Sequence, residues 1–115
     1  MNIAVLLLSL VLMTPVPKGP YALTGTLSYE SSKWVLDLDM DLIIDTKVPF
    51  ERILPFGVVD HEIGVLLVRR IEIDCRNPEE LKIGTRIEAT GFVKQKTEKD
   101  GVYFYFLVDR IREIR

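Results

Sequence analysis

Three aspartates alternate with apolar residues in the stretch WVLDLDMDLII, at Asp37, Asp39 and Asp41. Carboxylates two residues apart on a straight strand lie about 7 Å from each other, because a strand rises about 3.3 Å per residue. That spacing is too wide for a single calcium ion, which binds oxygen ligands at about 2.3–2.6 Å. We therefore predict no metal site here. We expect a solvated strand face on which Arg69 or Arg70 pairs with one or two of the aspartates.

Residues that usually carry catalysis are few. His61 is the only histidine and stands between two acids, and Cys75 is the only cysteine, so an internal disulfide and a cysteine-rich metal site are both excluded. The sequence contains no G-x-S-x-G motif of a serine nucleophile, no H-E-x-x-H zinc motif and no phosphate-binding loop. We predict no enzymatic activity, no catalytic residue and no cofactor.

The best candidates for ligand binding lie near the C-terminus, where cations and aromatic rings gather around one expected hairpin. Such an arrangement can bind single-stranded nucleic acid, because cations neutralise phosphates and rings stack on bases. The candidate binding residues are Phe92, Lys94, Lys96, Lys99, Tyr103 and Tyr105. Two acids interrupt the lysines, however, and lysine-rich strand edges also protect against aggregation.

Charge is distributed unevenly along the chain. Residues 1–81 carry 7 basic and 12 acidic side chains, whereas residues 82–115 carry 8 basic and 5 acidic ones, and the net charge is −2. A dedicated nucleic-acid-binding protein is usually strongly basic. The composition therefore favours a protein partner or self-association over single-stranded nucleic acid.

The first thirteen residues, MNIAVLLLSLVLM, contain no charged side chain, and the proline-rich TPVPKGP follows them. Their length and composition are typical of the apolar core of a secretory signal, although a positive flank and a cleavage pattern are missing. The run is shorter than the roughly 20 residues that cross a bilayer. Residues 1–20 are predicted to be an apolar leader plus linker. The leader is a signal, a membrane anchor or a segment that packs on the domain or on a second subunit. An extracytoplasmic or membrane-anchored location is slightly favoured over a cytoplasmic one.

Residues 21–115 form one predicted domain, in which apolar residues recur at every second position. In the second strand, Trp34, Met40 and the residues between them at the same spacing are expected to point inward. The segment 47–57 is expected to be a loop with a helical turn near 51–54. Residues 58–64 are also expected to form a loop. Asn77 is expected to cap a very short helix beginning at Pro78. The predicted strands are 21–30, 34–44, 64–74, 85–96 and 102–114.

Five strands, a short helical element between the third and fourth, and a long final hairpin resemble the oligonucleotide/oligosaccharide-binding (OB) fold, a small Greek-key barrel. Most of this resemblance lies in LKIGTRIEATGFV and GVYFYFLVDRIREI, with Gly25 where such a barrel bends sharply. It covers residues 21–115 and implies an all-β barrel. Another small five- or six-stranded barrel is the alternative.

The resemblance also implies a binding face centred on the second and third strands and flanked by the loops joining strands one to two and four to five. The line of aspartates lies on that second strand and would repel phosphate. The sequence therefore predicts a non-catalytic binding or interaction module, associated with a protein partner or with the cell envelope. Binding of single-stranded nucleic acid through the last hairpin is the alternative function.

Overall fold

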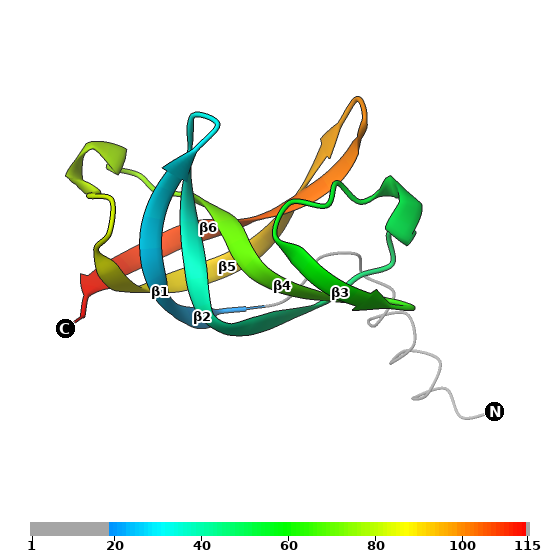
Figure 1. The fold of residues 1–115 in the computed structure, drawn as a ribbon, viewed down its shortest axis with the longest axis horizontal. Coiled ribbons are helices and arrows are strands. Elements are labelled where there is room, and N and C mark those ends of the chain that lie inside the picture. The colour runs from blue at the N-terminus through cyan, green and yellow to red at the C-terminus, as the bar shows by residue number, and fades with distance from the viewer. Residues whose placement is uncertain (1–18, 115) are drawn as a thin grey trace, which may run out of the picture.

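The computed structural model describes residues 19–114, and it is all-β, as the sequence predicts. Six strands and two single 3-10 turns follow one another along the chain (Figure 1). The elements are β1 Tyr21–Glu30, β2 Lys33–Asp45, η1 Phe50–Arg52, β3 Val58–Glu62, β4 Val65–Asp74, η2 Pro78–Glu80, β5 Arg86–Glu98 and β6 Gly101–Glu113. The five predicted strands and both predicted helical turns are present, and the strand ends differ by a few residues.

Five of the strands close a mixed barrel. β1 pairs with β2 and β5, β2 also pairs with β4, and β4 and β5 are joined through β6. All of these pairings are antiparallel except that of β4 with β6, which is parallel. β3 lies outside the closed barrel and pairs with the first half of β4 (Figure 1). The barrel prediction is confirmed at this level.

One continuous apolar core fills the barrel. Alternate residues of β1 and β5 point inward as predicted, among them Leu27, Ile87 and Val93, each no more than 2% exposed. Phe106 of β6 is completely buried among them. Because side chains alternate between the two faces of a strand, the same alternation leaves the intervening residues on the outer surface.

Gly25 and Gly91 lie where neighbouring strands approach too closely for a side chain. A Cβ atom on Gly25 would lie 2.2 Å from the carbonyl oxygen of Asp37, and one on Gly91 would lie 2.0 Å from that of Leu107. The neighbour is backbone in both cases, so it cannot move aside without separating two strands. The predicted requirement for glycine at position 25 therefore has a steric cause, and β1 as a whole is strongly curved (Figure 1).

Three predictions about local structure are wrong. Residues 58–62 were expected in a loop but form β3. Met40 was expected to point inward, but it is 80% exposed, because the pairing of β2 with β4 shifts register between Asp37 and Leu42. Asn77 precedes η2, but its side chain makes no capping hydrogen bond.

The predicted leader lies outside the described residues except for Gly19 and Pro20. Between residues 19 and 114 the chain forms no helix that is long and apolar enough to cross a membrane.

Candidate functional site

The predicted binding residues come together on the outer face of the β5–β6 hairpin. Phe92 pairs with Leu107, Lys94 with Tyr105 and Lys96 with Tyr103, so cations and rings alternate across the two strands. We call these six residues the hairpin face. Lys99 lies apart from it, in the turn that joins the two strands. Five of the six candidate residues therefore lie on one surface, and Lys99 does not.

The tyrosines of the hairpin face are less accessible than the sequence suggests. Tyr103 is only 8% exposed, because the ammonium groups of Lys33 and Lys96 lie 4.6 and 5.7 Å from the centre of its ring. Such cation–π contacts occupy the ring surface on which a base would stack. Phe92 is the accessible ring, at 39% exposed, with Lys94 at 5.7 Å.

Acids partly neutralise the cations of this face. Glu72 of β4 pairs with Lys33 at 3.3 Å, and Glu98 lies 3.9 Å from Lys96. Hydrogen bonding to Tyr103, followed by the nearby charges, raises the pKa of Lys96 and so favours its charged form. The result is a mixed surface of cations, acids and rings and not a continuous basic track of the kind that counterion release requires.

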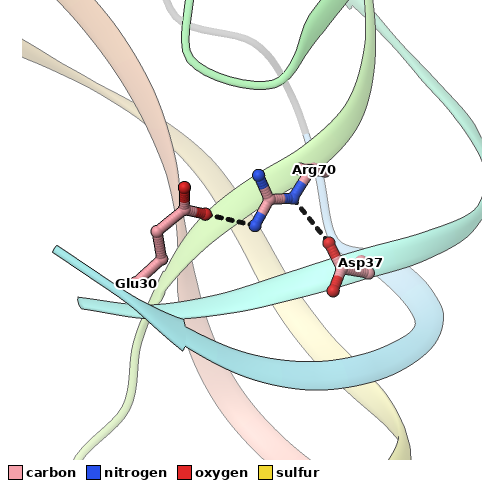
Figure 2. Close-up of polar contacts among 3 residues, drawn as sticks. All are labelled: Glu30, Asp37 and Arg70. Carbon is pink, nitrogen blue, oxygen red and sulfur yellow. Dashed lines mark hydrogen bonds and ion pairs between the residues drawn. The ribbon is translucent and has the colours of Figure 1, made fainter. Parts of the chain in front are cut away.

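The line of aspartates is neutralised by arginines from two other strands. Arg70 of β4 donates hydrogen bonds to Asp37, at 2.6 Å, and to Glu30 of β1 (Figure 2). Arg69 donates to Asp41. The pairing of Asp37 and Asp41 with β4 was predicted and is confirmed.

The third aspartate has a partner that the sequence analysis missed. Arg86 of β5 donates hydrogen bonds to both carboxylate oxygens of Asp39, at 2.9 and 2.5 Å. These bonds are the largest influence on the carboxyl group and hold its pKa below the ordinary value. All three aspartates thus have a cationic partner, and this face is less negative than the sequence alone suggests.

A second surface, unforeseen from the sequence, lies where β2, β4 and β3 continue beyond the barrel. We call Leu42–Asp45 of β2, Val65–Val68 of β4 and all of β3 the three-stranded extension. An open groove of about 690 Å³ runs beside it, lined by residues 46–51 and 61–66. The imidazole of His61 stacks on the ring of Phe50 here, with ring centres 3.5 Å apart.

Exposed apolar side chains are concentrated in this part of the chain. Of the ten large hydrophobic residues that are exposed among residues 19–114, six fall between positions 40 and 63, and Ile63 at the β3–β4 turn is fully exposed. They are Met40, Ile43, Phe50, Phe56, Val59 and Ile63. The signal that could have revealed β3 is the pair Val58 and Val59 followed by Gly64, since β-branched residues before a glycine turn are typical of a hairpin.

Groups suited to metal binding or catalysis do not converge among residues 19–114. No three His, Cys, Asp or Glu side chains of this part form a cluster that could hold a metal ion. Cys75 is a half-buried free thiol, and His61 is engaged by its stacking contact. The chain matches no protein-family model and no curated protein.

Proposed function

We propose that the protein is a non-catalytic protein-binding module built on an OB-type barrel, and that the three-stranded extension binds its partner. The OB assignment is supported by five strands closed in a Greek-key barrel with a helical turn between its third and fourth strands. The observation that carries the function is the concentration of exposed apolar residues between positions 40 and 63. Large exposed apolar patches mark interaction surfaces, because leaving them in water costs free energy.

The fully exposed Ile63 offers a direct test, because it makes no contribution to the core. The substitution Ile63→Asp should leave the fold intact and weaken partner binding. Ile83→Asp is the matched control, since Ile83 is also exposed, at 68%, and lies in the loop before β5, away from the extension (Figure 1). Both variants and the wild type would be used to capture partners from the native cells under identical conditions. A protein that is captured by the wild type and by Ile83→Asp, but lost with Ile63→Asp, is the expected result. Identical capture by all three would refute the proposal.

Binding of single-stranded nucleic acid is the second candidate, and the alternation of Phe92, Lys94 and Tyr105 on the hairpin face favours it. Its test is a titration of fluorescent oligonucleotides at low salt against the wild type and Lys94→Glu with Lys96→Glu. Salt-sensitive binding that the double variant weakens would support this function, because the two ammonium groups would be the phosphate contacts. Absence of binding at low salt would eliminate it.

Association with the cell envelope would depend on residues 1–13 and is a separate part of the proposal. Removing residues 1–18 should leave the barrel folded, because residues 19–114 already form a continuous buried core that runs from Leu23 to Phe106. Fractionation of cells that express either form would then show whether the leader is required for membrane association.

A further inference from the structure

The three-stranded extension has two outer strand edges. β4 lies in its centre and pairs with β2 on one side and β3 on the other. β1 pairs with β2 only over Lys33–Leu38, so within residues 19–114 no strand covers β2 at Leu42–Asp45, and none covers the outer edge of β3. An uncovered edge presents backbone N–H and C=O groups to which another chain can bind.

The edge of β3 is protected. The backbone N–H of His61 donates a hydrogen bond to the carboxylate of Asp60 at 2.8 Å, so this donor is already used. A register shift between Val58 and Asp60 distorts the strand, which is only five residues long. Short strands, bulges and acids are the usual means of preventing edge-to-edge pairing.

The edge of β2 also carries aspartates, but within residues 19–114 no side chain accepts a hydrogen bond from its outward N–H groups. Thr46 donates its backbone N–H to the carbonyl of Gly64 at 2.8 Å. Because hydrogen bonds alternate along an antiparallel pair, Ile44 and Thr46 face β4, and the N–H and C=O groups of Ile43 and Asp45 face away from it. The side chain of Ile43 is 58% exposed beside these groups.

The charged residues around the β2 edge indicate which kind of strand could bind there. Asp45 makes no ion pair within residues 19–114, and Asp60 and Glu62 lie across β4 from Ile43 and Asp45. Arg69 is occupied by Asp41. Asp45, Asp60 and Glu62 outnumber the one nearby cation of the described chain, the exposed Lys47, so the surroundings of the edge are net acidic and would attract a basic segment.

We propose that a basic, extended segment of a partner protein adds as a strand to β2 along Asp41–Asp45. This inference rests on the proposed function and names the class of partner. The backbone groups of Ile43 and Asp45 would bond to the added strand, an apolar side chain would pack on Ile43, and a lysine or arginine side chain would pair with Asp45.

Charge favours a basic chain over a second copy of this one. In an antiparallel pair of two β2 edges centred on Ile43 or on Ile44, Asp45 of each copy would lie opposite Asp41 or Ile43 of the other and would gain no partner of opposite charge. A lysine or arginine of a different chain supplies that partner, and opposite charges across two strands are stabilising. The proposed partner is therefore a different, basic chain.

The first experiment uses the synthetic peptide Lys-Val-Lys-Ile-Lys-Val-Lys and amide hydrogen exchange followed by NMR. We expect the amides of Ile43 and Asp45 to exchange faster than that of Ile44 in the free protein. Added peptide should slow them about tenfold or more, because they gain hydrogen bonds. The amide of His61 should not change. The peptide Glu-Val-Glu-Ile-Glu-Val-Glu is the control and should not protect any of these amides.

Proline substitutions then compare the two edges of the extension. Ile43→Pro and His61→Pro each remove an N–H that takes no part in the ladder with β4, and proline is tolerated at such edge positions. Ile43→Pro should weaken peptide binding about tenfold or more, since it removes one donor and places a ring at the edge. His61→Pro should change binding by less than about twofold. Asp45→Lys is a second variant, whose backbone is unchanged, and it should weaken binding and reduce its salt dependence.

Three results would overturn the strand-addition proposal: no protection of Ile43 and Asp45, equal loss of binding in both proline variants, or equal binding of the acidic peptide. These failures are distinguishable from failure of the proposed function. If capture of the native partner depends on Ile63 but not on Ile43→Pro or Asp45→Lys, the extension binds its partner in another way. If none of the three substitutions affects capture, the proposed function itself is wrong.

Discussion

Replacing Gly25 with alanine tests how the barrel closes. Gly25 of β1 lies opposite Leu38 of β2 on one side and Ile87 of β5 on the other, so three strands meet at this residue. A Cβ atom there would lie 2.2 Å from the carbonyl oxygen of Asp37. Close carbon–oxygen contacts between strands are about 3.3 Å long, so β1 and β2 must separate by about 1 Å to accept the methyl group.

The cost of this separation can be approximated from two contributions. Inserting a methyl group into a closely packed site costs about 1–3 kcal/mol, and weakening a backbone hydrogen bond costs about 1 kcal/mol more. We expect Gly25→Ala to lower the free energy of unfolding by about 3 kcal/mol. For a domain of this size, that loss corresponds to a fall in Tm of roughly 10–20 °C.

Gly84→Ala is the matched control. Gly84 has a positive φ of +88°, but a Cβ atom on it would meet no heavy atom within 4 Å. Only the strain of the left-handed conformation is added, at about 1 kcal/mol, and alanine offsets part of it by restricting the unfolded chain. The comparison of the two variants separates steric contact between strands from backbone strain.

Thermal unfolding followed by tryptophan fluorescence provides the measurement. Trp34 is the only tryptophan, and its ring lies 5.1 Å from that of Tyr29 across the β1–β2 pair, close to the region that must open. Far-ultraviolet circular dichroism would check that both variants remain folded at low temperature. If Gly25→Ala costs no more than Gly84→Ala, the strands adjust without penalty and the steric explanation for Gly25 is refuted.

Three further predictions concern the core and the ion pairs. Phe106→Ala should lower the free energy of unfolding by about 3–5 kcal/mol in urea titrations, because it removes a completely buried ring. A loss below about 1 kcal/mol would contradict the position of Phe106 in the core. Asp39 should titrate in NMR below its ordinary pKa of 3.8, and Arg86→Gln should return the pKa toward that value. Since the folded-state pKa is the lower one, this pair stabilises the fold above about pH 4, and the stabilisation disappears as the pH falls through the depressed pKa. Arg70→Gln should cost less than about 1 kcal/mol, because the pairs with Glu30 and Asp37 are solvent-accessible, and a larger loss that persists in high salt would contradict this.

The barrel strands were predictable because their period-two pattern reflects burial on one face only. β3 was missed because its side chains are mostly exposed and it pairs with a single strand, so burial imposes no alternation on it. Met40 was placed on the wrong face for a different reason. The register shift in β2 follows from the way β4 crosses it, and no local sequence pattern encodes that crossing.

Five of the candidate binding residues lie on one surface of the β5–β6 hairpin, but their accessibility was not predictable. The period-two pattern of β6 predicts that Tyr103 points outward and is exposed. Lys33 of β2, which is distant in the sequence, covers its ring. The same limit applies to Arg86, which reaches Asp39 although β5 does not pair with β2. Contacts of this kind depend on the order of strands around the barrel, and a period-two pattern carries no information about that order.

The position of an aspartate relative to the other strands therefore decides its physical role. Asp37, Asp39 and Asp41 each pair with an arginine of β4 or β5, and their charges are neutralised locally. Asp45 lies farther along the same strand, beside backbone groups that face no other strand of the described chain. Its negative charge gains no partner from an identical edge centred on Ile43 or Ile44, whereas a lysine or arginine of a basic segment would neutralise it. One residue thus favours a basic partner over self-association. That combination is what an open strand edge requires if it is to bind a partner without aggregating.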